Sequence, residues 1–165
     1  MKKYEFTGET KQVELLFRTA TLHRIKAVAE FGVVKIGDIG GWIEKEENLS
    51  HEGNAWVCGD AKVYGNAEVY GNAKVYGNAE VYGNAKVFSI SHVLVIGPIG
   101  SRNDFTTFFR DKDSEITVKC GCFLGKIDKF LEKVCETHGD SQYAIVYRTA
   151  VEIAKQQIDL SEEKQ

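Results

Sequence analysis

The chain has 165 residues, of which 27% are charged and 43% hydrophobic, which fits one folded domain or two small ones and excludes a disordered chain. Its formal net charge is -3 and its isoelectric point is near 5.8, so we expect neither nucleic acid nor an anionic membrane as a partner. No apolar stretch of signal-peptide length opens the chain, and the four cysteines do not resemble a secreted disulfide framework. The sequence therefore predicts a cytoplasmic protein with free thiols.

Residues 1–36 are predicted to form an N-terminal β cap. Two segments, residues 4–7 and 22–28, have strand-like composition and are separated by polar turn residues. Such a cap would cover the end of the repeat array that follows, where unpaired strand edges otherwise invite further stacking. The glycine-rich residues 37–44 lack the spacing of a phosphate-binding loop, and we interpret them as the first corner of the array.

A six-residue phrase, Gly-Asn/Asp-Ala-x-Val-Tyr, repeats from residue 53 to residue 88 with few changes. This period predicts a parallel β-helix, in which each repeat supplies one short strand and one corner. Side chains alternate across a strand, so Ala and Val point inward while the charged residue and the Tyr point outward. Degenerate repeats extend the predicted β-helix to residues 37–99; they place Ile43, Leu49, Ser91 and Gly97 in the Ala series and Val93 and Ile99 in the Val series.

The charges of the repeats indicate how many repeats close one coil. The outward residue after Ala alternates between Lys and Glu along the chain. With three repeats per coil, Lys62 would lie over Glu80 and Glu68 over Lys86, whereas two or four repeats would stack like charges on each other. The pattern therefore predicts three hexapeptides per coil.

The second outward position predicts rows of stacked aromatic side chains. Such rows are unusual on a monomer and indicate a contact surface between subunits. The alternative is that Tyr occurs there only for its β propensity. We predict that the contact surface includes Tyr64, Tyr70, Tyr76, Tyr82, Phe88 and His92.

Residues 100–165 are predicted to form a C-terminal α+β module, with a glycine- and proline-containing boundary at residues 97–104. Residues 105–109 and 116–123 have the pattern of two strands in a hairpin. Apolar residues at helical spacing then predict two helices separated by Gly139; they are Ile127, Phe130, Leu131 and Val134 in the first helix and Tyr143, Val146, Tyr147, Ala150 and Ala154 in the second.

The candidate ligand-binding cluster lies at the start of this module and comprises Arg102, Asn103, Asp104, Arg110 and Lys112. The planar fork of Arg suits phosphate or carboxylate, and a turn rich in Gly and Ser can add backbone donors. The alternative is that Arg102 pairs with Asp104, or with a neighbouring subunit, in a solvated junction.

The segment from Val69 to Lys74 resembles the hexapeptide repeat of left-handed β-helix proteins, with an aliphatic residue first, Asn fourth and a small residue fifth. That superfamily is typically homotrimeric and includes acyltransferases and a class of carbonic anhydrase. The resemblance implies a left-handed parallel β-helix that assembles as a homotrimer.

Across its whole length the chain is also similar to hexapeptide-repeat proteins of bacteriophages, prophages and their bacterial hosts. Residues 36–50 before the repeats, and residues 100–104, 120–123 and 137–140 after them, carry this similarity. That family offers no activity to transfer, and the similarity implies a phage-encoded accessory protein.

The histidines do not form a recognisable catalytic set. His92 is predicted to face outward above Lys74 and to belong to the subunit interface, and His51 to be a cap residue. His23 has no recognisable partner. The three suitably placed histidines of the hexapeptide carbonic anhydrases are not evident, so we predict no catalytic histidine.

Three cysteines and a histidine of the C-terminal module raise the alternative of a zinc site. Cys120 and Cys122 share one strand face, and Cys135 and His138 lie one turn apart on a predicted helix. Cys135 and His138 also continue the apolar stripe of that helix, where Cys behaves as a small hydrophobe. We predict no bound metal, and the zinc alternative stays open at this point.

Together these patterns predict a non-catalytic binding protein without a cofactor. The hypothesis is a homotrimeric, phage-encoded sponge that captures a small anionic ligand, such as a nucleotide signal of host defence, in pockets between subunits. A hexapeptide-repeat acyltransferase is the first alternative, and a structural or protein-binding trimer is the second.

Overall fold

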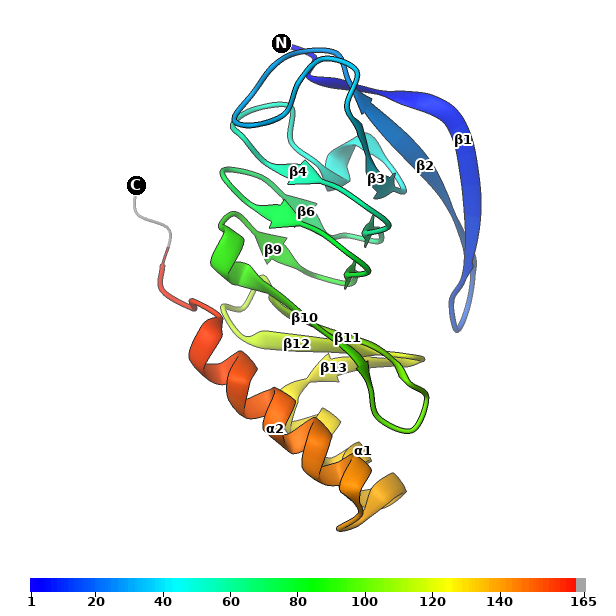
Figure 1. The fold of residues 1–165 in the computed structure, drawn as a ribbon, viewed down its shortest axis with the longest axis vertical. Helices are drawn as coiled ribbons and strands as arrows, with labels where there is room; N and C mark the ends of the chain where they lie inside the picture. The colour runs from blue at the N-terminus through cyan, green and yellow to red at the C-terminus, as the bar shows by residue number, and fades with distance from the viewer. Residues whose placement is uncertain (163–165) are drawn as a thin grey trace.

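The computed structural model describes residues 1–162, which form a mainly β protein with two helices at its C-terminal end (Figure 1). An N-terminal hairpin leads into a stack of short strands, and a four-stranded sheet with the two helices follows. Neither α-helix of residues 1–162 has the combination of length and hydropathy that a bilayer-spanning segment requires.

The N-terminal hairpin consists of β1 (Tyr4–Glu14) and β2 (Thr19–Ala27), which are antiparallel. β2 also pairs with β3 (Ile39–Ile43), and the 3-10 turn η1 (Glu46–Asn48) follows. Both strands predicted in residues 1–36 are therefore confirmed. The first continues to Glu14, past the predicted residues 4–7, and the second begins at Thr19, before the predicted residues 22–28.

The repeats form a stack of turns that we call coils. The two-residue strands pair in parallel with the strand eighteen residues further on, as Lys62 does with Glu80 and Glu68 with Lys86. Three hexapeptides therefore make one coil, as the charge pattern predicted. The strands are β4 (Trp56–Val57), β5 (Lys62–Val63), β6 (Glu68–Val69), β7 (Lys74–Val75), β8 (Glu80–Val81) and β9 (Lys86–Val87).

The interior of the coils is filled by the Ala and Val of each repeat, which are buried throughout. The glycine that opens each repeat has a φ between 62° and 74°, a region that Gly adopts freely and other residues avoid. Small interior side chains and a glycine corner thus allow the chain to turn after only two strand residues.

One of the two predicted ionic contacts is present on the outside of the coils, since Glu68 and Lys86 are in register but form no ion pair within residues 1–162. Lys62 Nζ lies 3.2 Å from Glu80 Oε1, and the rings of Tyr64 and Tyr82 stack with centroids 4.6 Å apart. The rings of Tyr70 and Phe88 are 5.3 Å apart. The eighteen-residue register therefore sets both the ionic and the aromatic contacts between coils.

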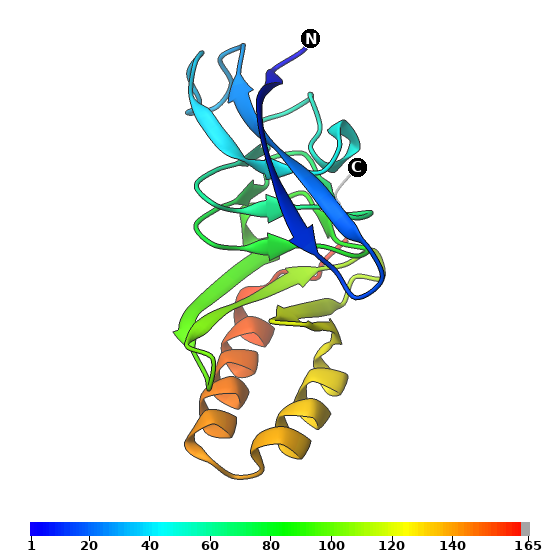
Figure 2. The ribbon, with the colours of Figure 1, turned by 90° about the vertical axis from the view of Figure 1, so that its right-hand side faces the viewer.

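The hairpin does more than cap the end of the stack. Its first residues, including Tyr4, pack on the end coil, but the hairpin also crosses the side of the coils (Figure 2). There Ala20 and Leu22 cover Trp42 and Tyr64 in a separate apolar cluster. One face of the stack is therefore buried within the chain itself.

The C-terminal part is a four-stranded antiparallel sheet, in the order of the chain, that is followed by two helices. Both predicted helices and the predicted hairpin are confirmed, but the second predicted strand, residues 116–123, ends at Cys120 and a turn at Gly121 and Cys122 leads into another strand. The elements are η2 (Ile90–His92), β10 (Val93–Ile99), β11 (Asp104–Arg110), β12 (Ile116–Cys120), β13 (Phe123–Lys126), α1 (Ile127–His138) and α2 (Gln142–Gln157).

The expectation that residues 91–99 continue the repeats is wrong, and Ile43 and Leu49 pair with Val63 and Val69 and not with the Ala series as predicted. The hydroxyl of Ser89 accepts a hydrogen bond from the Ser91 N–H and starts η2 where a Gly-Asn corner would be needed. β10 then pairs antiparallel with β11. The six-residue register consequently ends at Phe88.

The four-stranded sheet lies between the coils and the helices. Successive side chains of β11 point to opposite faces, so Phe109 belongs to the core of the coils and Phe108 to the core beneath α1 and α2. The sheet thus closes the second end of the stack and carries a second core.

Two glycines at the same repeat position test this packing. Gly65 and Gly77 have φ values of 67° and 64°, but a Cβ at Gly65 would lie 2.6 Å from the Tyr82 ring, whereas a Cβ at Gly77 would meet nothing within 4 Å. Gly77→Ala should cost about 1 kcal/mol of unfolding free energy for the left-handed backbone alone. Gly65→Ala should cost at least about 1 kcal/mol more, because the stacked ring must move. Urea unfolding of both variants measures the difference, and equal losses would contradict the packing described.

Candidate functional site

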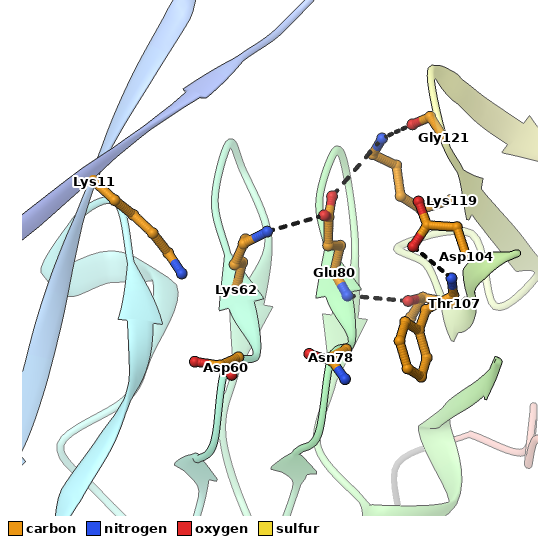
Figure 3. A pocket seen from close by; sticks show the side chains of 10 residues that line it. Lys11, Asp60, Lys62, Asn78, Glu80, Asp104, Thr107, Lys119 and Gly121 are labelled. Atoms are coloured by element: carbon orange, nitrogen blue, oxygen red, sulfur yellow. Dashed lines mark hydrogen bonds and ion pairs between the residues drawn. The ribbon is translucent and has the colours of Figure 1, made fainter. Parts of the chain in front are cut away.

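A polar pocket of about 400 Å³ lies where the hairpin, the coils and the C-terminal sheet meet (Figure 3). We call it the junction pocket. Three different parts of the chain contribute to it, because β1, β5, β8, β11 and β12 all carry lining residues. Its principal side chains are Lys11, Lys62, Asn78, Glu80, Asp104 and Lys119.

Glu80 is the centre of the hydrogen-bond network in this pocket. Its carboxylate lies 3.2 Å from Lys62 Nζ and 3.8 Å from Lys119 Nζ, and it accepts a hydrogen bond of 2.9 Å from the Tyr64 hydroxyl. Its backbone N–H donates to Thr107 Oγ1 at 3.0 Å, which ties the last coils to β11. Burial, and then the neighbouring Glu80 carboxylate, raise the pKa of Tyr64, so this phenol remains a donor.

Lys11 reaches into the pocket from β1 with a less complete set of partners. Its ammonium lies 4.1 Å from the centre of the Trp42 ring, and within residues 1–162 it makes no ion pair. Burial, and then the charge of Lys62, lower the pKa of Lys11, although Asp60 and Glu80 oppose this. An incoming anion could therefore pair with Lys11 without displacing a carboxylate, which is not the case for Lys62 and Lys119.

Two further carboxylates, those of Asp60 and Asp104, line the pocket, so it contains charges of both signs. Asp60 lies 3.7 Å from Arg24, and Asp104 Oδ1 accepts a hydrogen bond of 2.7 Å from the Phe105 N–H. The ring of Phe105 also lines the pocket. This arrangement suits a ligand that combines an anionic group, hydrogen-bond donors and a planar apolar part. Neither histidine nor cysteine is among the described residues that line it.

The five residues predicted to bind ligand are not brought together. Arg102, Asn103 and Asp104 lie at one end of β11, and Arg110 and Lys112 lie at the other, about 20 Å away for a strand of this length. Asp104 lines the junction pocket, and Arg102 lines another pocket between the sheet and the helices.

The side chain of Arg110 is buried and contacts other side chains of the same chain. It is 5% exposed, its guanidinium lies 4.8 Å from the Phe88 ring centre, and its Nη2 donates to Ser114 Oγ at 2.7 Å. The backbone N–H of Lys112 donates to Asn84 O at 2.9 Å. These contacts attach the sheet to the last coil.

The residues predicted to face another subunit also differ in position. Tyr64 is fully buried beneath the hairpin, with Tyr82 packed against the same cluster, and His92 is 1% exposed with its Nδ1 accepting from the Phe88 N–H at 3.2 Å. Tyr64 and His92 are therefore covered within one chain. Tyr76 remains 37% exposed.

A third pocket, of about 420 Å³, contains His51 beside Glu46. His51 Nε2 lies 3.9 Å from the Glu46 carboxylate, and Nδ1 accepts a hydrogen bond of 3.3 Å from the Lys3 N–H. Burial lowers the pKa of His51, although Glu46 opposes this. The hydrogen bond to Nδ1 occupies the lone pair of the neutral ring, which leaves no free basic nitrogen in this geometry.

The zinc alternative is not supported in the part of the chain that the structure describes. No three side chains of His, Cys, Asp or Glu in residues 1–162 approach one another as metal ligands would. Cys120, Cys122 and His138 line the pocket that contains Arg102, whereas Cys135 does not.

Sequence reasoning identified Lys62 and Glu80 only as a ladder pair and did not identify Lys11 or Lys119 as site residues. The alternation of β12 could have placed Lys119 on the face toward the coils, since Phe109 and Thr107 occupy the same face of β11. No local signal places Lys11 beside Lys62, because the two residues are far apart in sequence.

Comparison with known proteins finds a match to part of the chain but does not assign the chain to a family. No family model matches the chain. Over 61 residues it is 34% identical to the uncharacterized acetyltransferase YdcK of Escherichia coli (strain K12). The match covers 34% of this chain and 19% of YdcK, so the chain spans about a fifth of the length of this relative.

Proposed function

We propose that the chain is a non-catalytic binding protein that captures a small anionic ligand of nucleotide type in the junction pocket. The observation that supports this most directly is that Lys11 reaches a pocket of about 400 Å³ without an ion pair in residues 1–162, whereas Lys62 and Lys119 in the same pocket pair with Glu80. That volume is within the usual range for small-molecule sites.

The mixed lining favours a nucleotide over a simple anion. A phosphate group can pair with Lys11, whose ammonium has no carboxylate partner among residues 1–162. The amino and hydroxyl groups of a nucleotide can donate to Asp104 and to the side-chain oxygen of Asn78, and its base can lie against Phe105. A protein that holds such a ligand unchanged acts as a sponge, and removal of a nucleotide signal of host defence is the role that we propose for it in a phage.

We further propose that the coils form a left-handed parallel β-helix and that three copies associate. The eighteen-residue register and the glycine corners support the helical arrangement. The hairpin covers the face of Tyr64, so the face carrying Cys58 and Tyr76 is the one we assign to the contact between copies.

Ligand binding is tested by calorimetry with adenosine and guanosine monophosphates and their cyclic forms. Lys11→Gln should weaken nucleotide binding about tenfold or more, because a hydrogen bond to a charged group contributes about 1.5–3 kcal/mol. The affinity should also fall as pH rises, and at a lower pH than an ordinary lysine requires, because the pKa of Lys11 is lowered and deprotonation removes the cation.

Lys74→Gln is the matched control, since Lys74 has the same repeat position as Lys62 but does not line the pocket. Its nucleotide affinity should equal that of the wild type. Absence of binding to every nucleotide, or equal losses in Lys11→Gln and Lys74→Gln, would refute the junction pocket as the site.

Association is tested by light scattering after gel filtration. The wild type should have three times the 18.4 kDa mass of one chain. Tyr76→Lys should reduce this mass, because it adds a charge to the exposed face of Tyr76, whereas Asn66→Lys, on another exposed corner, should not. A monomeric wild type would eliminate the trimer.

Acetyl transfer is a second candidate, favoured by the similarity to YdcK over 61 residues. The pocket of His51 is where we would place it, since it is the pocket that holds a histidine and a nearby carboxylate. The hydrogen bond from the Lys3 N–H to Nδ1 argues against a basic role, which is why this candidate is second.

The two candidates differ in what happens to the ligand. Bound nucleotide should be recovered unchanged after heat denaturation, and acetyl-coenzyme A should release no free thiol in the presence of amine and hydroxyl acceptors. Thiol release that His51→Gln abolishes, but Lys11→Gln does not, would establish the second candidate instead.

A further inference from the structure

A pocket of about 210 Å³ lies on the other face of the sheet from the junction pocket. Lys119 lines the junction pocket and its neighbour Cys120 lines this one, because successive side chains of β12 point to opposite faces. Residues from the turn after β10, from the β12–β13 turn and from both helices surround it. We call it the Arg102 pocket.

The charges that line the Arg102 pocket are of one sign. Arg102 and Lys133 line it together with His138, and no Asp or Glu is among its lining residues. Within residues 1–162 neither Arg102 nor Lys133 makes an ion pair, although most other arginines do. Arg102 and Lys133 are both exposed side chains at the edge of the pocket, and no carboxylate lines it, so these two cations would attract an anion there.

Two glycines with positive φ make room for the polar groups of this pocket. A Cβ at Gly121, whose φ is 56°, would overlap Nη1 of Arg102. A Cβ at Gly100, whose φ is 75°, would overlap the hydroxyl of Tyr147. The buried phenol of Tyr147 thus packs closely against the backbone at Gly100, and the exposed side chain of Arg102 lies over the backbone at Gly121.

The floor of the pocket is apolar and aromatic. Phe130 and Val134 are 3% and 4% exposed, and the rings of Phe130 and Tyr147 meet edge to face with centroids 5.7 Å apart. His138 stacks on Tyr147 at 5.7 Å. A ligand here would place an apolar body on these rings while its charged group remained at the rim.

We propose that the Arg102 pocket binds a small carboxylate with a compact aromatic body. The carboxylate would pair with the fork of Arg102 and with Lys133, and the ring would lie on Phe130 and Tyr147. The pocket has a volume of about 210 Å³, about half that of the junction pocket, which suits a ligand with one substituted ring. This site is separate from the junction pocket and does not depend on the function proposed there.

Benzoate is the probe, and benzamide is its neutral counterpart of the same shape. Calorimetry or ligand-observed NMR should detect benzoate binding to the wild-type chain and at least about tenfold weaker binding of benzamide. Arg102→Gln should weaken benzoate binding about tenfold or more, and Lys133→Gln should weaken it by a smaller factor. Circular dichroism verifies that each variant is folded.

Lys129→Gln is the control on the same helix, since Lys129 is 72% exposed, pairs with Glu132 and does not line the pocket. It should leave benzoate binding unchanged, as should Lys11→Gln, so this proposal and the nucleotide proposal fail independently. If Arg102→Gln does not fold, the benzoate affinity of Lys133→Gln tests the proposal in its place. Equal binding of benzoate and benzamide, no binding of benzoate at millimolar concentration, or unchanged binding in the folded variants would overturn the proposal.

Discussion

Each coil forms backbone hydrogen bonds with the coil eighteen residues further on, as the Lys62 N–H does with Ala79 O at 2.9 Å and the Tyr64 N–H with Val81 O at 3.1 Å. Because each strand has only two residues, these bonds hold only if every corner turns in the same way. The positive φ of the repeated glycine and the small interior Ala make this regularity possible. The same register places Lys62 beside Glu80 and thereby positions the charged centre of the junction pocket.

A stack of coils leaves unpaired strand edges at both ends, and the non-repeating parts of the chain cover them. At one end β3 of the hairpin sheet pairs with β5, and at the other Ala85 bridges Asp111 while the Lys112 N–H donates to Asn84 O. The covering segments extend past the coils on one side, where Lys11 of β1 and Lys119 of β12 both approach Glu80. The junction pocket therefore follows from the way in which the two ends are closed.

Local patterns predicted the coil register, the C-terminal hairpin and both helices, because each depends on residues near one another in sequence. The path of the hairpin had no such signal, so the burial of Tyr64 beneath Leu22 could not be foreseen. The five predicted ligand-binding residues are not neighbours in space, because β11 extends from Asp104 to Arg110 and places Arg102 and Arg110 near its opposite ends. His92 was misplaced because the Ser89 cap ends the repeat before it.

The distribution of charge explains why ligand sites are expected at the junctions and not within the repeats. Where Lys62 meets Glu80, the next coil supplies a partner of opposite sign, so an incoming ion would have to displace it. Lys11 and Arg102 arise outside the repeat and make no ion pair in residues 1–162. They lie toward opposite faces of one sheet, on either side of Gly121. Breaking the repeat thus creates the unpaired cations that a small anion can bind.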